Sequence, residues 1–288
     1  MQPGDQIAES IRQRAKNSGF DPLDAMRRFA MERFIVRLNE ADNSQKIVLK
    51  GGMVWWLRPE LAEHARSTYD VDIHLHIPES HEDVVSLFQR AQEIDCGDGC
   101  RYEFKKISKL EHTGEHEGLR VMIRGYIGSK FVDFHSDIGF GGTRPSNIAP
   151  STFKSMHPRL SDGCIVMTPP EFVVSEKIHA IAKHGMSNTR LKDYNDLYVL
   201  SGFNLNIGEL ASAMETTFSD RDFDIPADAS EMAGLSEEFA AQNQEQWDRW
   251  LVRANRSHKM PTDFKEVVEA VSDFADSIIR YRHVLTPC

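Results

Sequence analysis

The chain changes its hydrophobic pattern at Pro169-Pro170, and this change limits the possible folds more than any other feature of the sequence. Before the prolines, short alternating apolar stretches are separated by stretches with helical periodicity, a pattern typical of a mixed α/β sheet. After the prolines, apolar residues recur only at helical spacing. We therefore expect an α/β (α+β) domain over residues 1–168 and a helical domain over residues 169–288.

The expected secondary structure follows this division. Glycine and proline pairs, polar turns and changes of period mark the borders between segments. Strands are expected at residues 46–50, 67–76, 101–107, 119–126 and 130–140. Helices are expected at residues 6–16, 22–38, 53–62 and 82–91 in the first domain, and at residues 171–184, 191–200, 207–218, 236–254 and 263–282 in the second.

Four arginines lie in the expected helix over residues 22–38. The apolar residues of this helix form a stripe, and the arginines lie largely off it. We interpret the arginines as a solvated helix face, with contact to RNA as the alternative. They are Arg27, Arg28, Arg33 and Arg37.

Composition excludes two broad classes of protein. With 40% hydrophobic and 27% charged residues, the chain resembles a globular protein rather than a disordered one. No apolar run approaches the ~18 residues that span a bilayer, and the N-terminus lacks a signal-peptide pattern. We therefore expect a cytoplasmic protein with no contact to a membrane.

The net charge of -10 does not exclude nucleic acid as a partner. Residues 202–250 contain eleven acidic and two basic residues, a net charge of -9, so the rest of the chain is nearly neutral. A phosphate-binding surface on the first domain is therefore electrostatically possible.

Two aspartates in the second expected strand are the first candidates for chemistry. Asp70 and Asp72 stand on the same face of that strand, with Cα atoms ~7 Å apart. Carboxylates at this spacing suit Mg²⁺, which prefers hard oxygen ligands. His74 and His76 extend the same face. We interpret these histidines as partly exposed strand residues, with a zinc or general-base role as the alternative.

Further residues add to this candidate site. Gly51 and Gly52 end the first expected strand and open a helix, where a backbone without Cβ atoms lets a triphosphate approach the amide groups. The strand at 130–140 carries Asp133 and Asp137 on one face, and either can deliver a third carboxylate. Three acids beside a phosphate site suit two-metal phosphoryl transfer. Lys177 offers a compact positive charge for a nucleotide's phosphates.

Five motifs, taken in order, resemble the AbiEii/AbiGii toxin family, whose members are similar to DNA polymerase beta-type nucleotidyltransferases. The resemblance extends over nearly the whole chain, and five ordered motifs are far more specific than any one of them. The motifs are LKGG at 49–52, RSTYDVD at 66–72, DIGFG at 137–141, EKIHA at 176–180 and NTRLKDYNDL at 188–197.

The resemblance implies the toxin of a type IV toxin–antitoxin or phage-defence pair. Such a protein transfers a nucleotide from an NTP with Mg²⁺ or Mn²⁺ as cofactor, and relatives of the MenT type add nucleotides to the 3′ end of tRNA. The implied partners are an NTP, a tRNA acceptor and a cognate antitoxin. The implied fold is a polymerase beta-like mixed sheet with flanking helices, and a C-terminal helical domain that completes the nucleotide site.

The same resemblance implies roles for individual residues. Asp70, Asp72 and Asp137 match the catalytic acids that bind metal. Lys177 matches the lysine expected at the nucleotide, and Asp193 matches the acid of the R-x-K-D motif. The implied nucleotide-binding residues are Lys50, Gly51, Gly52, Arg66, Ser67, Thr68 and Lys177.

Two departures from the family pattern leave points open. Gly-Gly-Met stands where Gly-Ser or Gly-Gly-Thr is frequent, so a hydroxyl contact to phosphate is missing or comes from Ser67 or Thr68. Asp133 competes with Asp137 as the third metal ligand. The alternatives to RNA modification are nucleotidylation of a protein hydroxyl, a non-catalytic NTP-binding regulator and a metal-dependent nuclease.

Overall fold

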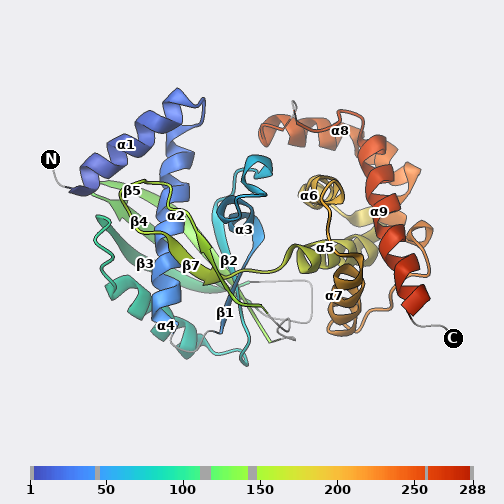
Figure 1. Cartoon of the computed structure of the whole chain (residues 1–288), viewed down its shortest axis with the longest axis horizontal. Helices are drawn as coiled ribbons and strands as arrows, with labels where there is room; N and C mark the ends of the chain where they lie inside the picture. The colour runs from blue at the N-terminus through green and yellow to red at the C-terminus, as the bar shows by residue number, and fades with distance from the viewer. Residues whose placement is uncertain (1–2, 43–45, 111–117, 142–147, 257–258, 286–288) are drawn as a thin grey trace. The chain divides into compact units, whose positions relative to one another are not determined.

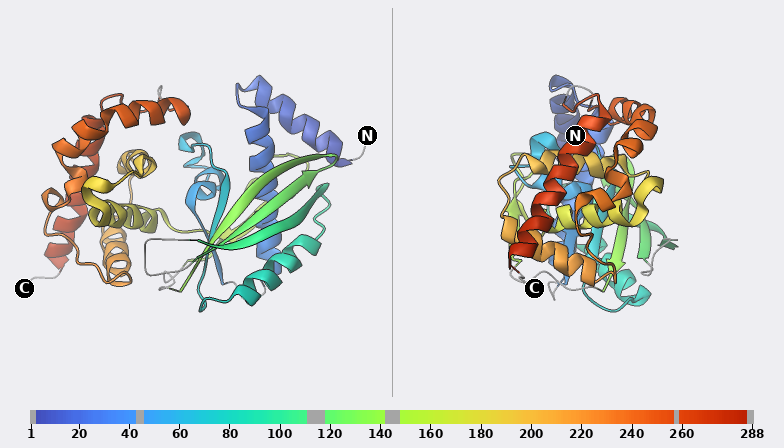
Figure 2. Two further views of the ribbon diagram at one scale, coloured as in Figure 1. Left: turned by 180° about the vertical axis from the view of Figure 1, so that it is seen from behind. Right: turned by 90° about the vertical axis from the view of Figure 1, so that its right-hand side faces the viewer.

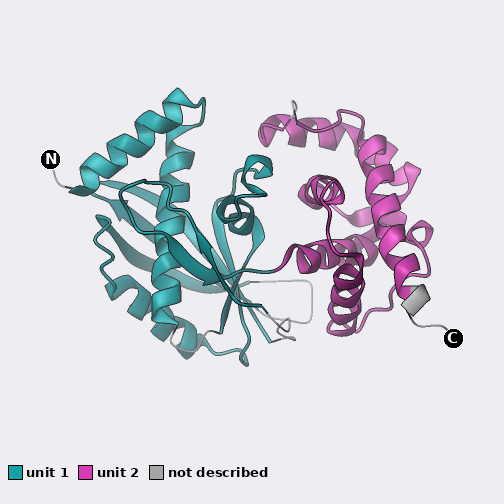
Figure 3. Ribbon diagram, viewed as in Figure 1, with its two compact units in different colours: residues 1–168 teal, residues 169–288 magenta. Residues whose placement is uncertain are grey.

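The computed structural model describes residues 3–42, 46–110, 118–141, 148–256 and 259–285, with the side chains of the last helix described up to residue 282. The chain divides into two compact units, Met1–Thr168 and Pro169–Cys288, which have different colours in Figure 3. Each unit buries its own set of apolar side chains, and each is described by itself.

The first unit is built on a five-stranded mixed sheet with the strand order β1-β2-β5-β4-β3. β2 and β5 are parallel, and the other neighbours are antiparallel. This sheet confirms the expected fold class. The elements, most of them labelled in Figure 1, are α1 (Pro3–Asn17), α2 (Pro22–Ala41), β1 (Ile47–Lys50), α3 (Gly51–Leu57), β2 (Asp70–Leu75), α4 (His81–Glu93), β3 (Cys100–Leu110), β4 (Gly118–Ile127), β5 (Lys130–Phe140), β6 (Pro150–Phe153) and β7 (Gly163–Val166).

Helix α2 packs against β3, β4 and β5 on one face of the sheet, and it lies behind these strands in the left panel of Figure 2. The side chains of β4 and β5 alternate between buried and accessible positions, because successive residues of a strand point to opposite faces. The buried set packs under α2, where the rings of Phe34 and Phe134 are 5.8 Å apart. The accessible set carries the charged residues of these two strands.

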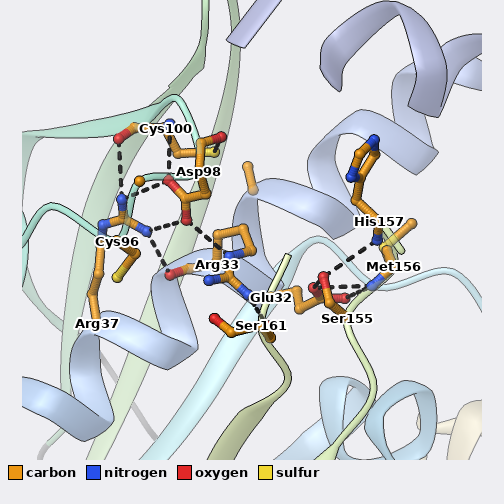
Figure 4. A network of polar contacts seen from close by, with 12 residues as sticks. Glu32, Arg33, Arg37, Cys96, Asp98, Cys100, Ser155, Met156, His157 and Ser161 are labelled. Atoms are coloured by element: carbon orange, nitrogen blue, oxygen red, sulfur yellow. Dashed lines mark hydrogen bonds and ion pairs between the residues drawn. The ribbon is translucent and has the colours of Figure 1, made fainter. Parts of the chain in front are cut away.

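The arginines of α2 do not form the solvated face that we expected. Arg33 and Arg37 are fully buried, and both bind the carboxylate of Asp98, at 2.8 and 2.7 Å (Figure 4). Arg27 and Arg28 are half-buried against aromatic rings. The expectation was wrong because α1, α4 and the sheet all pack on α2, so positions off its apolar stripe also lack solvent. Asp98 and backbone carbonyls accept hydrogen bonds from both buried guanidinium groups, although Nη2 of Arg33 is buried without a hydrogen-bond partner.

The two-stranded sheet of β6 and β7 was not expected from the sequence. Each strand is four residues long, too short to show a convincing alternation. The strands pair with each other, and Met167, just after β7, bridges to Leu49 of β1. The amide of Thr168 also donates to the oxygen of Leu49 at 2.9 Å. These contacts hold the end of the first unit beside the strand that leads to Gly51.

The second unit contains the helices α5 (Pro170–His184), α6 (Leu191–Ser201), α7 (Ile207–Ser219), α8 (Glu237–Arg253) and α9 (Phe264–Leu285). Its core is strongly aromatic. Trp247 stacks on Phe264 with ring centroids 4.9 Å apart, and Tyr194 stacks on Phe239 at 5.4 Å. All four rings are fully buried. Within the described ranges of both units, no helix has the length and apolar character that a bilayer crossing requires.

Candidate active site

A tight turn joins β1 directly to α3. Lys50 is the last residue of β1, and Gly51 and Gly52 begin α3, two positions before the expected helix start. Gly51 has a φ of +67°, a conformation that L side chains rarely adopt. A Cβ at Gly51 would lie 1.7 Å from Oδ2 of Asp72, so only glycine fits here. The glycine turn therefore lies directly against the strand that carries the paired aspartates.

The pairing register places predicted site residues in one row of the sheet. Asp72 of β2 lies opposite Lys50 of β1 and opposite Asp137 of β5. Asp70 lies opposite His135 in the same parallel pairing. Residues in direct register share a face of a sheet, and all three aspartates occupy partly accessible positions. Asp70, Asp72 and Asp137 therefore lie together on the accessible face.

Arg120 of β4 lies opposite Asp137 and binds it with both arms of its guanidinium. Nε donates to Oδ1 at 2.7 Å, and Nη2 donates to Oδ2 at 2.6 Å. These hydrogen bonds raise the pKa of Arg120 above its ordinary value, and the negative charges of Asp137, Asp70 and Asp72 contribute to the increase. One guanidinium is thus close enough to interact with all three carboxylates.

Arg120 was not expected as a site residue from the sequence. In the sequence, its only indication is its position on the polar side of the strand at 119–126, and Arg124 lies on the same side. The side chain that each arginine meets depends on strand order and register, and no local pattern reveals these.

Asp133, the alternative third ligand, lies elsewhere on the same face. It accepts two hydrogen bonds from Arg124, at 2.7 and 2.8 Å. The pairing between β2 and β5 starts at His135, so no residue of β2 lies opposite Asp133. Asp137 rather than Asp133 is therefore the acid that shares a row with Asp72.

Thr68 connects the paired aspartates to the glycine turn. Its hydroxyl donates a hydrogen bond to Oδ1 of Asp70. A Cβ on Gly52 would lie 2.5 Å from Oγ1 of the same threonine. A hydroxyl group thus stands beside the turn, which has no serine or threonine of its own.

Arg66 and Ser67 lie on the segment that precedes β2. The indole Nε1 of Trp56 donates to the backbone oxygen of Arg66 at 3.0 Å, which ties this segment to α3. The side chain of Arg66 is half-buried, and Ser67 is exposed. Contact of either residue with phosphate stays a prediction.

His74 and His76 extend the face of Asp70 and Asp72, as the alternation of the strand requires. Nε2 of His74 lies 2.5 Å from the backbone oxygen of Gly141, and the two imidazole rings are 4.7 Å apart. Both histidines are half-buried. The contact with Gly141 links β2 to the residue that follows β5, which favours a structural role for His74.

The donor atoms of this face fit a divalent cation in their chemistry. The oxygens of Asp70, Asp72 and Asp137 are the hard ligands that Mg²⁺ prefers. Among the residues that the structure describes, however, no group of three acidic, histidine or cysteine side chains is already gathered as a metal site. On this face, Arg120 engages both oxygens of Asp137. A cation shared by the three acids would therefore compete with Arg120.

The second unit brings Lys177 of α5 and Asp193 of α6 into direct contact. Nζ of Lys177 is 2.6 Å from Oδ1 of Asp193 and 2.9 Å from Oδ2 of Asp196, and Nε of Arg190 is 2.6 Å from Oδ2 of Asp193. Burial alone would raise the pKa of Asp193, but the charges of Lys177 and Arg190 outweigh burial and lower it. Asp193 is thus an ionised carboxylate held inside the unit. The roles of Lys177 and Asp193 at a nucleotide stay predictions.

Comparison with protein families gives a match over most of the chain. The family model described as "Nucleotidyl transferase AbiEii toxin, Type IV TA system" matches residues 33–270. The matched range includes all five motifs that carry the resemblance, and it confirms that resemblance. Comparison with curated proteins gives no match.

Two matches among solved structures are proteins of Helicobacter pylori. JHP933 from Helicobacter pylori has a TM-score of 0.51 and 17% sequence identity, over 88% of this chain and 91% of that chain. A Helicobacter pylori protein provisionally described as a nucleotidyltransferase has a TM-score of 0.48 and 14% identity, over 90% of this chain and 97% of that chain. At such low identity, the similarity to JHP933 supports the fold alone.

Proposed function

Because the chain belongs to the AbiEii family of type IV toxin–antitoxin nucleotidyl transferases, we propose that it transfers a nucleoside monophosphate from an NTP to RNA. The acceptor that we propose is the 3′ end of a tRNA, as the resemblance to MenT-type toxins implies. One observation carries the proposal. Asp72 lies between Lys50 and Asp137 in one row of the sheet, with the Gly51 turn packed against it.

The residues of the glycine turn and its row have separate tasks in this reaction. Gly51 and Gly52 offer backbone amide groups to the triphosphate, because no Cβ blocks the approach. Lys50 adds positive charge beside them. The acceptor hydroxyl attacks the α-phosphorus and forms the new O–P bond, the bond from the α-phosphorus to pyrophosphate breaks, and the hydroxyl proton passes to solvent. Positioning and charge stabilisation provide most of the catalysis in such transfers.

Mg²⁺ or Mn²⁺, when bound, would activate the attacking oxygen and stabilise the charge of the leaving pyrophosphate. The residues that would hold it are Asp70, Asp72 and Asp137. Thr68 holds the carboxylate of Asp70 by a hydrogen bond, and Arg120 holds that of Asp137 by two. Asp70 is thus oriented by a fixed neighbour, whereas binding of the cation to Asp137 would require Arg120 to give up at least one of its two hydrogen bonds.

Lys177 is the residue that we propose neutralises the nucleotide's phosphates. Its ammonium group is held by Asp193 and Asp196, and its side chain is 13% exposed. A lysine that is held at a fixed point loses less conformational entropy on binding phosphate than a mobile one. The proposed role of Asp193 is to hold Lys177 in that position.

The biological context of the protein follows from its family. Membership in a toxin–antitoxin family implies an antitoxin partner. We propose that the pair acts in phage defence and that modification of tRNA is the toxic step.

A transfer assay tests the proposed function. The purified protein is incubated with Mg²⁺, total tRNA and each NTP in turn, with a radiolabel on the α-phosphate. We expect label on tRNA with at least one NTP, and mass spectrometry should locate the added nucleotide at the 3′ end. Asp70→Asn and chelation by EDTA should each abolish the label. No transfer with any NTP, or equal transfer by wild type and Asp70→Asn, would contradict the proposal.

The same assay separates the alternatives. Label on a polypeptide instead of RNA would identify a protein hydroxyl as the acceptor. Shortened RNA in the absence of any NTP would identify a nuclease. Tight NTP binding without turnover, with either Mg²⁺ or Mn²⁺, would identify a regulator.

A further inference from the structure

The accessible face of the first unit's sheet continues beyond the candidate active site, and we infer that this continuation binds the acceptor as single-stranded RNA. The inference rests on the proposed function and adds the path by which RNA reaches the site. We name this region the arginine–aromatic surface. It consists of Arg101, Lys106, Met122, Arg124, Tyr126 and Phe131.

The strand register places these residues on one face. Tyr126 of β4 lies opposite Arg101 of β3 on one side and Phe131 of β5 on the other. A register shift within β3 brings Lys106 opposite Met122. The surface therefore crosses three neighbouring strands, and it lies opposite the face that α2 covers.

The surface exposes flat groups that are already stacked. The guanidinium of Arg101 lies 3.5 Å from the ring centroid of Tyr126, and that of Arg124 lies 4.3 Å from the centroid of Phe131. Phe131 is 53% exposed and Met122 is 36% exposed. Unpaired bases stack on aromatic rings and on guanidinium planes, and such stacking tolerates any base. These groups thus suit a single strand rather than a duplex, whose bases are already stacked.

The charge of the three strands also suits RNA. β3, β4 and β5 contain seven Lys or Arg residues and three Asp or Glu residues. Lys109 and Lys130 lie opposite the buried Leu119 and Ile127, on the other face, which leaves at most five basic and three acidic residues, a net charge of +2, for the accessible face. The whole chain has a net charge of -10. The accessible face of these strands is therefore slightly basic in an acidic protein, and phosphate attraction contributes to the affinity for a polynucleotide.

A protein partner fits this surface less well than RNA. The buried centre of a protein interface is depleted of lysine, aspartate and glutamate, although arginine and aromatic residues are enriched there. The arginine–aromatic surface includes Lys106, and the carboxylates of Glu103 and Asp133 bind its Tyr126 and Arg124. Burial of these charged groups by an apolar partner would remove their solvent.

The arginine–aromatic surface continues along the sheet to the row that contains Lys50, Asp72 and Asp137. Phe131 and Asp137 belong to the same strand and are six residues apart, which corresponds to ~20 Å along β5. On β4, Arg124 and Arg120 lie on the same face and follow the same path toward Asp137. A strand of RNA that stacks at Phe131 can therefore follow β4 and β5 until its 3′ end reaches Asp137.

A binding experiment tests the inference without requiring catalysis. Fluorescence anisotropy measures the Kd of a short fluorescein-labelled oligoribonucleotide for the full chain, with no NTP present. The double variant Phe131→Ala/Arg101→Gln removes one exposed aromatic ring and one exposed arginine from the surface. The matched control, Phe20→Ala/Arg249→Gln, removes the same residue types from exposed positions elsewhere, with Phe20 58% exposed and Arg249 67% exposed.

We expect the surface variant to bind ~5- to 100-fold more weakly than wild type, from the loss of stacking on one base. The control should bind within about twofold of wild type. The slope of log Kd against log salt should decrease by about 0.7 in the surface variant, because one phosphate contact is lost. Equal thermal midpoints for the two double variants would show that folding does not cause the difference.

Three results would overturn the inference. The first is no binding of the oligoribonucleotide by wild type. The second is equal affinity of the two double variants. The third is a change of oligomeric state in the surface variant without a change of affinity, which would identify a protein contact. Loss of RNA binding by the surface variant, together with no nucleotide transfer by wild type, would leave the binding surface in place and contradict only the proposed function.

Discussion

Arg120 and Asp137 are joined across β4 and β5 by two hydrogen bonds, 2.7 and 2.6 Å long, in the row of the sheet that also contains Asp72. Arg124 and Asp133 form a second pair of the same kind on the same two strands, at 2.7 and 2.8 Å. The pairs differ in their neighbours, because only the first lies opposite β2. Each pair is therefore a natural control for the other.

Asp137→Asn should reduce nucleotide transfer by at least ~100-fold, whereas Asp133→Asn should leave it within a few-fold of wild type. Removal of one fixed charge at the reacting centre typically has an effect of this order. Both variants lose a carboxylate bound to arginine, so effects on the sheet itself should be similar. Initial rates at saturating NTP and thermal midpoints measure the two effects. A larger loss in Asp133→Asn would identify Asp133 as the third acid.

Gly51→Ala should abolish transfer, because a Cβ there would lie 1.7 Å from Oδ2 of Asp72. Gly97→Ala is the matched control. Gly97 has a φ of +63°, but nothing lies within 4 Å of the position that its added Cβ would take. Both variants should lose about 1–2 kcal/mol of stability from backbone strain. Urea unfolding and transfer rates measure the two effects, and an active Gly51→Ala would show that the turn does not need to approach Asp72.

Lys177→Met should destabilise the second unit by about 3–5 kcal/mol, since it leaves the fully buried carboxylate of Asp193 with less compensation. Arg190→Gln removes the other cation bound to Asp193, but the side chain of Arg190 is 49% exposed. Its loss should therefore have a smaller effect, about 1 kcal/mol or less. Urea unfolding of the full chain measures the destabilisation of both variants. Equal destabilisation would mean that solvent does not screen Arg190.

Asp98→Asn should lower the free energy of unfolding by about 3–5 kcal/mol, because two fully buried arginines lose their shared counter-charge. The control is Glu9→Gln, which breaks an ion pair with Arg12 whose side chains are 59% and 40% exposed. That change should amount to less than about 1 kcal/mol. Similar values for the two variants would show that Asp98 contributes no more than a surface pair.

Glu32 should make the protein less stable as pH rises from about 4.5 to about 7. Burial raises the pKa of Glu32 from 4.5 to about 7 in the folded state. Between these values the folded state holds a proton that the unfolded state has released, so the free energy of unfolding falls with pH, by roughly 3 kcal/mol in total. Urea unfolding at pH 5 and pH 8 should show this decrease in wild type and a smaller one in Glu32→Gln. An equal decrease in wild type and Glu32→Gln would mean that other groups cause the loss of stability.

Local patterns in the sequence were sufficient for several parts of the fold and the site. Strict alternation identified β2 and placed Asp70 and Asp72 on one face, because a strand has a period of two whatever surrounds it. The glycine pair identified the turn at Gly51, since a positive φ and a close approach both favour glycine.

Other predictions failed because they depended on neighbours that are distant in the sequence. The arginines of α2 were predicted to face solvent from the helix period alone. Their burial depends on α1, α4 and the sheet, which pack around α2, and on Asp98, which lies beside Arg33 and Arg37.

The sequence by itself determined which side chains could do chemistry: the paired aspartates, the glycine turn and the acids of β5 are all local features, set by period and residue type. Only the tertiary structure decided which of them meet. The parallel pairing of β2 with β5 selected Asp137 over Asp133, and the antiparallel pairing with β4 brought in Arg120. Strand register arises from hydrophobic packing across the whole sheet, and no single strand contains that information.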